Sequence, residues 1–255
     1  MSAQEPDILK PNVLRARDRQ LGYGRPIGIM VLEERIPCPP GTPGNPTTFS
    51  FPVCYEIARG VSADSLTDAS HPGGLRSLVA AGRSLIERGA CAVAGACGLM
   101  IVHQQPLARA LGVPVFTSSL LQLPLIAQML GADAAVGVIC SSEARLGAEH
   151  LRLATAGAEV SIALASMEGQ PHFRAAVCDQ SGALDFERVQ AEVVEVARTL
   201  VSRNRKVGAI LFECVDLPPY ASAVQQAVGL PVFDITTLIG HAFSALVRRP
   251  FDGVY

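Results

Sequence analysis

Two of the seven cysteines occupy equivalent positions in two similar stretches of the chain. Cys97 and Cys214 are 117 residues apart, and the same shift places residues 112–116 (GVPVF) on residues 229–233 (GLPVF). Each cysteine comes shortly after an apolar run and just before a stretch with helical periodicity, a pattern typical of a strand, a turn and a helix. Thiols exchange protons near neutral pH, so two of them can act as acid and base on opposite faces of one carbon atom. The repeat therefore predicts a two-cysteine acid/base pair, provided that both halves present their cysteines to one cleft.

Apolar runs alternate with amphipathic stretches along most of the chain, and these elements must position the two cysteines. The apolar runs predict strands at 27–32, 49–57, 90–94, 113–116, 134–140, 159–163, 207–212 and 231–233. The periodic stretches predict helices at 75–88, 99–111, 120–130, 144–156, 186–203, 220–228 and 236–247. This alternation is typical of an α/β fold in which parallel sheets are flanked by helices. We expect two pseudo-symmetric lobes, each with a short parallel sheet.

The repeat also predicts how the chain is divided between the lobes. We expect an N-terminal arm at residues 1–24, lobe one at 25–117 plus 235–255, and lobe two at 118–234. Both cysteines then lie at the carboxyl edge of a parallel sheet, where open α/β folds bind their ligands. Unpaired backbone N–H groups at a helix start favour a thiolate, so the sequence predicts that the pKa of both thiols is lowered.

An anionic intermediate at this edge requires hydrogen-bond donors, and several polar residues follow the predicted strands. The candidate substrate-binding residues are Asn45, Thr47, Gly98, Thr117, Ser118, Ser119, Val215 and Asp216. Serine and threonine are equally typical of helix caps at such places, so both interpretations stay open for them. The same alternatives apply to Ser141 and Ser142, and Tyr220 either reaches the cleft or anchors its helix.

Composition argues against several other classes of protein. A net charge of −2 gives no basic footprint for nucleic acid, and no apolar run reaches the roughly 18–20 residues of a membrane span. The polar first residues predict no secretory signal, so we expect a cytoplasmic protein. An odd number of scattered cysteines, without CxxC pairs, speaks against a disulfide scaffold, and the five dispersed histidines against a metal site. No nucleotide-binding motif occurs, and the two-thiol scheme requires no cofactor.

The motifs around the two cysteines resemble those of the aspartate/glutamate racemase superfamily. The resemblance rests on AVAGACGL around Cys97, LFECVDLPPYA around Cys214, the two GxPVF segments and the loop GNPTTF at residues 44–49, and it extends over residues 27–246. The superfamily includes amino-acid and hydantoin racemases, maleate isomerase and arylmalonate decarboxylase, and the chain is more distantly similar to algal dimethylsulfoniopropionate lyases. The resemblance implies an oligomeric enzyme without pyridoxal phosphate, in which both cysteines act as acid and base.

The residues after each cysteine depart from the pattern of the amino-acid racemases in this superfamily. Those enzymes usually have Cys-Asn-Thr in the first half and Cys-Thr-His or Cys-Thr-Glu in the second. Here the triplets are residues 97–99 (CGL) and 214–216 (CVD), so Asp216 could replace the partner of the second cysteine. The polar side chains that hold an amino acid's α-carboxylate are missing, and the sequence does not favour free glutamate or aspartate as substrate.

The leading hypothesis is a racemase or epimerase acting on a carbon next to a carboxylate or carbonyl, with a small carboxylate-containing compound as its substrate. A lyase, a decarboxylase or a cis–trans isomerase could use the same cysteines. A non-catalytic bilobal binding protein is an alternative from another class, and so is a thiol redox protein, although CxxC is missing.

Overall fold

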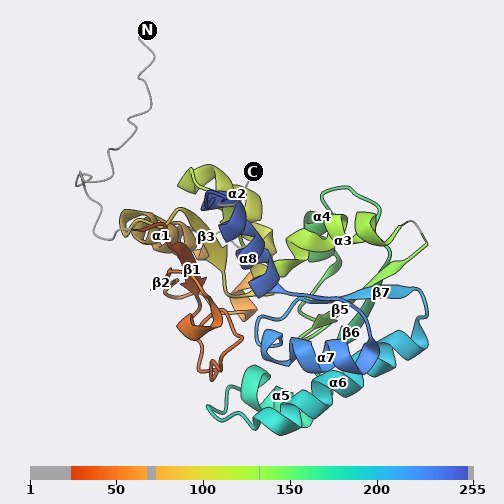
Figure 1. Ribbon diagram of the computed structural model, residues 1–255. Coiled ribbons are helices and arrows are strands. Elements are labelled where there is room, and N and C mark those ends of the chain that lie inside the picture. The colour runs from red at the N-terminus through yellow and green to blue at the C-terminus, as the bar shows by residue number, and fades with distance from the viewer. Residues whose placement is uncertain (1–23, 68–72, 132, 252–255) are drawn as a thin grey trace.

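The computed structural model describes residues 24–67, 73–131 and 133–251, and it contains two four-stranded parallel sheets (Figure 1). The predicted N-terminal arm lies almost wholly outside these residues. The first sheet has the order β2-β1-β3-β4, with strands β1 (Ile27–Val31), β2 (Val53–Ile57), β3 (Ala92–Gly95) and β4 (Val115–Phe116). The second has the order β6-β5-β7-β8, with strands β5 (Ala135–Cys140), β6 (Ile162–Ser166), β7 (Val207–Phe212) and β8 (Val232–Phe233). The predicted α/β architecture is confirmed.

The two sheets repeat one another in topology and in local detail. The shift of 117 residues that relates the cysteines also places α2 (Gln104–Leu111) on α7 (Ala221–Val228), residue for residue. Both helices end at a glycine with a left-handed backbone, Gly112 at φ 68° and Gly229 at φ 69°, a conformation that glycine adopts without steric cost. The sequence repeat is therefore a structural duplication.

The strands β1 and β3 of the first sheet are buried on both faces, which explains why they are almost entirely apolar. Side chains alternate along β1, so Ile27 points to the face covered by α8 (Ile235–Leu246), together with Ala92 and Ala94 of β3. Met30 and Val93 belong to the opposite face, which α1 (Gly73–Glu87) covers. The last helix of the chain thus returns to the first sheet, as Figure 1 shows.

The second sheet is also enclosed by helices. On one side lie α6 (Phe186–Arg203) and α7, and on the other lies α3 (Leu123–Leu130), which contacts β5 and β7 (Figure 1). Next to α3 lies α4 (Ala148–Thr155). The largest apolar cluster contains side chains of both sheets, from Met30 and Val93 to Val136 and Leu211, so the two halves share one core.

The short helices lie mostly in the connections at the ends of the strands. They are η1 (Pro46–Thr48), η2 (Asp64–Leu66), η3 (Gly98–His103), η4 (Ser119–Gln122), α5 (Pro171–Phe173), the π-helical turn η5 (Arg174–Cys178) and η6 (Pro218–Tyr220). No helix in the described part of the chain has the length and apolar character needed to cross a membrane.

Several boundaries differ from the sequence prediction, mainly where a loop replaces the first turn of a helix. The helix predicted at 99–111 begins with the tight 3-10 turn η3, and the helix predicted at 144–156 begins only at Ala148, because Gly147 has an extended backbone. The strand predicted at 159–163 lies at Ile162–Ser166, and only the second half of 49–57 is a strand. Each of these segments adjoins the carboxyl edge of a sheet or an irregular connection.

Candidate functional site

Cys97 and Cys214 line the same cavity, between the carboxyl edges of the two sheets. Their neighbours Gly98, Val215 and Asp216 line it as well. The cavity measures about 40 Å³, whereas pockets that hold a small molecule usually measure roughly 300–1,000 Å³. The structure therefore brings the two predicted cysteines to one small cavity.

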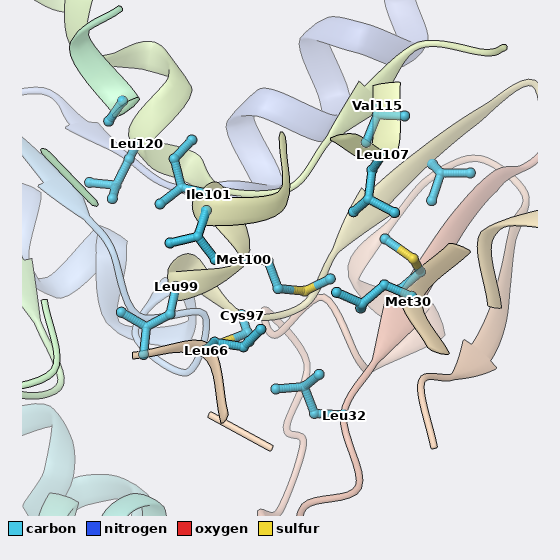
Figure 2. Close-up of a cluster of buried hydrophobic side chains, with 14 of the residues drawn as sticks. Met30, Leu32, Leu66, Cys97, Leu99, Met100, Ile101, Leu107, Val115 and Leu120 are labelled. Carbon is cyan, nitrogen blue, oxygen red and sulfur yellow. The ribbon is translucent and has the colours of Figure 1, made fainter. Parts of the chain in front are cut away.

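Each cysteine is placed by the same local structure. Cys97 follows β3, and Cys214 follows β7. The backbone oxygen of Cys97 accepts a hydrogen bond of 3.1 Å from the N–H of Met100. In the same way, the backbone oxygen of Cys214 accepts one of 3.3 Å from the N–H of Leu217. Cys97 is 9% exposed and Cys214 6%. Figure 2 shows Cys97 among buried apolar side chains such as Leu66. Both thiols are thus shielded from water except towards the cavity.

Gly98 allows the two halves to approach closely beside the thiols. A Cβ atom added to Gly98 would lie 2.1 Å from Oε1 of Glu213 and 2.5 Å from the backbone oxygen of Glu213. No side chain fits there, since neither the buried backbone nor the carboxylate could move away easily. Glu213 directly precedes Cys214 in the chain. The Glu213 carboxylate therefore lies against the backbone that follows the other cysteine.

The covering loop, residues 33–52, crosses the cavity from the first sheet to the second half of the chain. The backbone N–H of Arg35 donates a hydrogen bond of 2.9 Å to Oε1 of Gln180, and both Ile36 and Gln180 line the cavity. Farther along, Pro39 lies beside Phe173 in a small apolar gap between this loop and the second half. Through Glu34 and Ile36 this loop forms part of the cavity wall.

The charges around the thiols oppose their ionisation. Burial raises the pKa of Cys97 well above the ordinary value, and the carboxylates of Glu34 and Glu213 add to this effect. Burial likewise raises the pKa of Cys214, reinforced by Asp216 and Glu213. The prediction of lowered thiol pKa values is wrong for this site, because desolvation and negative neighbours outweigh the backbone N–H groups at the helix starts.

The carboxyl groups of the cavity are themselves shifted towards their protonated forms. Burial raises the pKa of Glu213 to about 7, although a backbone hydrogen bond from Ser141 opposes the shift. Burial and the charge of Glu34 raise the pKa of Asp216 to about 7. These groups change charge near neutral pH, where an acid/base catalyst works best.

Asp216 is the acceptor for one of the two thiols. The Sγ atom of Cys214 donates a hydrogen bond of 3.6 Å to Oδ2 of Asp216. Because the pKa of Cys214 lies well above that of Asp216, the proton rests on the thiol in this site, and an ionised Asp216 is the group that can receive it when the thiol ionises. No side-chain acceptor of this kind is found for Cys97 among the described residues.

The predicted hydroxyl residues after β4 lie outside the cavity lining. Thr117, Ser118 and Ser119 are fully buried. Thr117 donates to Oε1 of Gln104 (2.8 Å), and Ser118 accepts a hydrogen bond of 3.2 Å from the N–H of Leu120 at the start of η4. Ser119 donates to the backbone oxygen of Phe212 (2.7 Å), which links the two halves. All three hydroxyls thus have structural partners, and Ser118 is a helix cap.

The predicted loop residues Asn45 and Thr47 shape the covering loop. The side chain of Asn45 accepts from the N–H of Thr47 (2.9 Å) and donates to the backbone oxygen of Cys38 (2.8 Å). Neither residue is among those lining the cavity.

The remaining polar candidates differ in their placement. Ser141 lines the cavity, whereas Ser142 donates a hydrogen bond of 3.0 Å to Glu168. The buried ring of Tyr220 packs on Phe186, which anchors its helix.

Sequence reasoning missed several side chains of the cavity, namely Glu34, Arg145, Gln180 and Glu213. Glu213 comes directly after an apolar strand and Glu34 two residues after an apolar run, the same signal that identified the cysteines, so that signal could have found them. Arg145 belongs to a segment predicted as helical, and Gln180 has a left-handed backbone (φ 49°) in an irregular connection. Their sequence neighbourhood contains no comparable signal.

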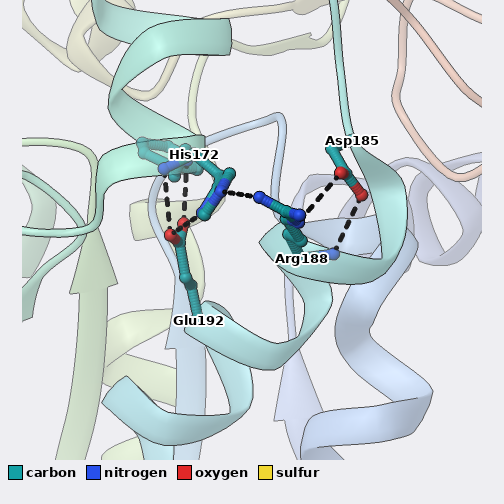
Figure 3. Close-up of polar contacts among 5 residues, drawn as sticks. His172, Asp185, Arg188 and Glu192 are labelled. Atoms are coloured by element: carbon teal, nitrogen blue, oxygen red, sulfur yellow. Dashed lines mark hydrogen bonds and ion pairs between the residues drawn. The ribbon is translucent and has the colours of Figure 1, made fainter.

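The segment that carries Gln180 into the cavity is fixed on α6 by Glu192 (Figure 3). This carboxylate accepts hydrogen bonds from the backbone N–H groups of His172 (2.9 Å) and Phe173 (2.8 Å), and it contacts Nδ1 of His172 (2.7 Å). Nη1 of Arg188 lies 3.0 Å from Nε2 of the His172 ring. Because an arginine side chain only donates hydrogen bonds, Nε2 is the acceptor in this pair, and Nδ1 carries the proton of the ring. Glu192 therefore caps the start of α5 from another helix.

Replacing Glu192 by alanine is expected to lower the free energy of unfolding by about 2 kcal/mol, because two backbone N–H groups and an imidazole lose their acceptor. Urea denaturation of the purified protein measures this change. The matched control is Glu195→Ala, which removes an exposed carboxylate from the same helix. Equal stability of the two variants would contradict the capping role.

A wider groove of about 470 Å³ lies between β6 and α6, beside Glu195 and Arg203. None of the cysteines lines it, and it is open to solvent, so the smaller cavity remains the candidate site. Among the residues that the structure describes, no three side chains of His, Cys, Asp or Glu are grouped so that they could hold a metal ion.

Comparisons with known sequences identify relatives that are named as lyases. No protein-family model matches the chain. Dimethylsulfoniopropionate lyase 5 of Emiliania huxleyi (strain CCMP1516) is 27% identical over 247 residues, which cover 89% of this chain and 47% of that protein. The dimethylsulfoniopropionate lyase of Durusdinium sp. clade D is 26% identical over 234 residues, covering 89% of this chain and 77% of the relative. The chain thus spans about half the length of the first of these relatives.

Comparisons with solved structures identify decarboxylase and racemase folds. Unliganded arylmalonate decarboxylase has a TM-score of 0.58 and 17% identity, covering 91% of this chain and 98% of the other. Allantoin racemase from Pseudomonas fluorescens has a TM-score of 0.56 and 17% identity, covering 90% of this chain and all of the other. The resemblance predicted from the two cysteine motifs is confirmed, and the chain has the fold of the aspartate/glutamate racemase superfamily.

Proposed function

We propose that this protein is an enzyme that uses Cys97 and Cys214 to move a proton at the carbon next to the carboxylate of a small acid. The single observation that carries the proposal is that both thiols, from equivalent strand ends of a duplicated fold, line one small cavity. Two proton-exchanging groups on either side of a small space are what such chemistry requires.

The surroundings of the two thiols give them different roles in this scheme. Asp216 is the acceptor for the proton of Cys214, an uphill transfer because the thiol has the higher pKa, and the Cys214 thiolate then removes the α-proton of the substrate. The carbanion is stabilised by delocalisation into the carboxylate. Cys97, which stays protonated beside Glu34 and Glu213, donates its proton to the opposite face of the carbon. The net result is inversion at that carbon, with one proton taken up and one released.

Elimination is the second candidate, and the sequence relatives favour it. Their names specify dimethylsulfoniopropionate, a propionate with a sulfonium group, as the compound that they cleave. In an elimination Cys214 removes the α-proton, the electron pair forms a carbon–carbon double bond, and the bond to the β-substituent breaks. A sulfonium group departs as a neutral sulfide and needs no proton, so Cys97 is then dispensable as an acid.

Incubation in deuterium oxide tests the proposal and separates its two forms. Racemisation or epimerisation is expected to place deuterium at the α-carbon of recovered substrate together with inversion, as NMR and chiral chromatography measure. Elimination of dimethylsulfoniopropionate is expected to release acrylate and dimethyl sulfide. The panel comprises amino acids, hydantoins, maleate, malonates and sulfonium acids. If none of them exchanges, isomerises or decomposes, the protein is better described as a bilobal binding protein.

A further inference from the structure

Strand β6 is an outer strand of the second sheet, and among the described residues it pairs only with β5. Hydrogen bonds at its two ends belong to this ladder: the N–H of Val136 donates to Ser161 (2.8 Å), and the N–H of Met167 donates to Cys140 (2.9 Å). A strand in a parallel ladder turns the backbone groups of every second residue towards the same neighbour. The alternate residues therefore direct their N–H and C=O groups to the open edge, and these are Ile162, Leu164 and Ser166.

The other outer strands of the two sheets are protected against pairing with a further strand. On the open side of β2, the guanidinium group of Arg88 donates a hydrogen bond of 3.1 Å to the backbone oxygen of Tyr55. Strands β4 and β8 have only two residues each. Charged side chains, prolines and short length are the usual protection of an edge, whereas β6 has five residues, IALAS, without charge or proline. In the part of the chain that the structure describes, β6 is thus the unprotected edge.

The groove of about 470 Å³ lies beside this edge and has the dimensions to receive a helix. Helix α6 contacts both β5 and β6, and the small side chains of Ala163 and Ala165 lie on its side of the sheet and line the groove. Neighbouring strands are about 4.8 Å apart and packed helices about 8–10 Å apart. A sheet that continues beyond β6 through a second β6 would therefore bring a second α6 into the groove at the normal packing distance.

The charges along the groove complement themselves under a two-fold rotation. On α6 the side chains of Glu195, Thr199 and Arg203 follow one another at intervals of four residues and line the groove. Glu195 accepts a hydrogen bond of 3.4 Å from Thr199, and neither charged group forms an ion pair with a described residue. A two-fold axis beside Thr199 reverses this order in a second copy, so that Glu195 of each copy faces Arg203 of the other.

We propose that two copies of this chain associate through β6, in antiparallel orientation, and that their α6 helices pack side by side across the groove. Leu164, the middle residue of the open edge, then lies opposite Leu164 of the second copy, and the two four-stranded sheets become one continuous sheet. The self-complementary charges favour a second copy over an unrelated peptide as the occupant of the groove. This inference goes beyond the proposed function, and the reaction at the two thiols does not bear on it.

Charge reversal on α6 tests the pairing in the full chain. Sedimentation equilibrium of the unmodified protein is expected to show an even number of chains. Glu195→Arg and Arg203→Glu are each expected to raise the dissociation constant of the pairing at least about tenfold, because two ion pairs across the axis become two pairs of like charge. Arg198→Glu is the matched control, since Arg198 is exposed on the same helix but does not line the groove.

The two reversals combined in one chain distinguish the pairing from a general effect of surface charge. The variant with both Glu195→Arg and Arg203→Glu is expected to associate as tightly as the unmodified protein, within about threefold, because opposite charges again face each other. A monomeric unmodified protein would overturn the inference. So would single reversals that leave the mass unchanged, or a combined variant that stays dissociated. Circular dichroism of each variant verifies that the chain is folded.

Discussion

Replacing Cys214 by serine is expected to reduce kcat at least about a thousandfold, because a hydroxyl is a far weaker acid than a thiol and removing a positioned base typically costs 10²–10⁴-fold. Cys97→Ser is expected to reduce racemisation to the same extent, since reprotonation from the opposite face then has no donor. For elimination, Cys97→Ser is expected to have a much smaller effect. Steady-state kinetics with each product measures both outcomes.

The structure provides a control for these two substitutions. Cys91 lies at the opposite end of the strand that leads to Cys97, partly buried, with its Sγ 3.4 Å from the backbone oxygen of Arg25. Cys91→Ser should retain nearly full activity. Serine is close in size to cysteine, so circular dichroism should show folded protein in all three variants. Normal kcat in both Cys97→Ser and Cys214→Ser would refute the two-thiol mechanism.

Asp216→Asn is expected to lower kcat about a hundredfold and to remove a limb of the pH profile. The pKa of Asp216 is raised to about 7, so below this pH the group is protonated and cannot accept the proton of Cys214. The kcat of the unmodified enzyme should therefore rise as the pH increases through about 7 and then level off. Asparagine does not titrate, so the variant should lack this rise while keeping the shape of the side chain.

Glu213→Gln distinguishes Asp216 from the other carboxyl group that titrates in the same range. The pKa of Glu213 is also raised to about 7, and Glu213 lines the same cavity. Because Asp216 receives the proton in the proposed mechanism, the glutamine variant should keep the rise in kcat with pH. If the rise disappears with Glu213→Gln and remains with Asp216→Asn, the roles of the two carboxyl groups are the reverse of those proposed.

Much of the architecture could be predicted from local patterns. The long helix α6 and the strand β7 have the predicted bounds, because a sustained apolar periodicity and an uninterrupted apolar run are strong signals. The repeat was informative for the same reason, since Gly112 and Gly229 require the same unusual backbone at the same distance from each cysteine. The two cysteines, each at the same distance from a GxPVF segment, were therefore predicted to lie at corresponding strand ends.

The rest of the cavity depends on contacts between distant segments. Hydroxyl groups after β4 were predicted as binding residues because they follow a strand, yet Ser119 donates to Phe212 in the other half instead. Arg145 enters the cavity only because the helix starts at Ala148, after a loop that the apolar periodicity does not reveal. Which polar group faces the cavity and which one joins the halves is decided by how the two sheets pack, and no local pattern contains that information.

The duplication repeats α2 and β4 residue for residue as α7 and β8 but is unequal in chemistry, and this has a stereochemical consequence. The shift of 117 residues places Leu99 on Asp216 and Ala96 on Glu213, so only the second half supplies acidic neighbours from these positions. A substrate with two hydrogens on its reactive carbon presents one of them to each sulfur. Cys214, which alone has a carboxylate acceptor, would withdraw the hydrogen on its side far faster, and the enzyme would distinguish pro-R from pro-S although its scaffold is nearly symmetric.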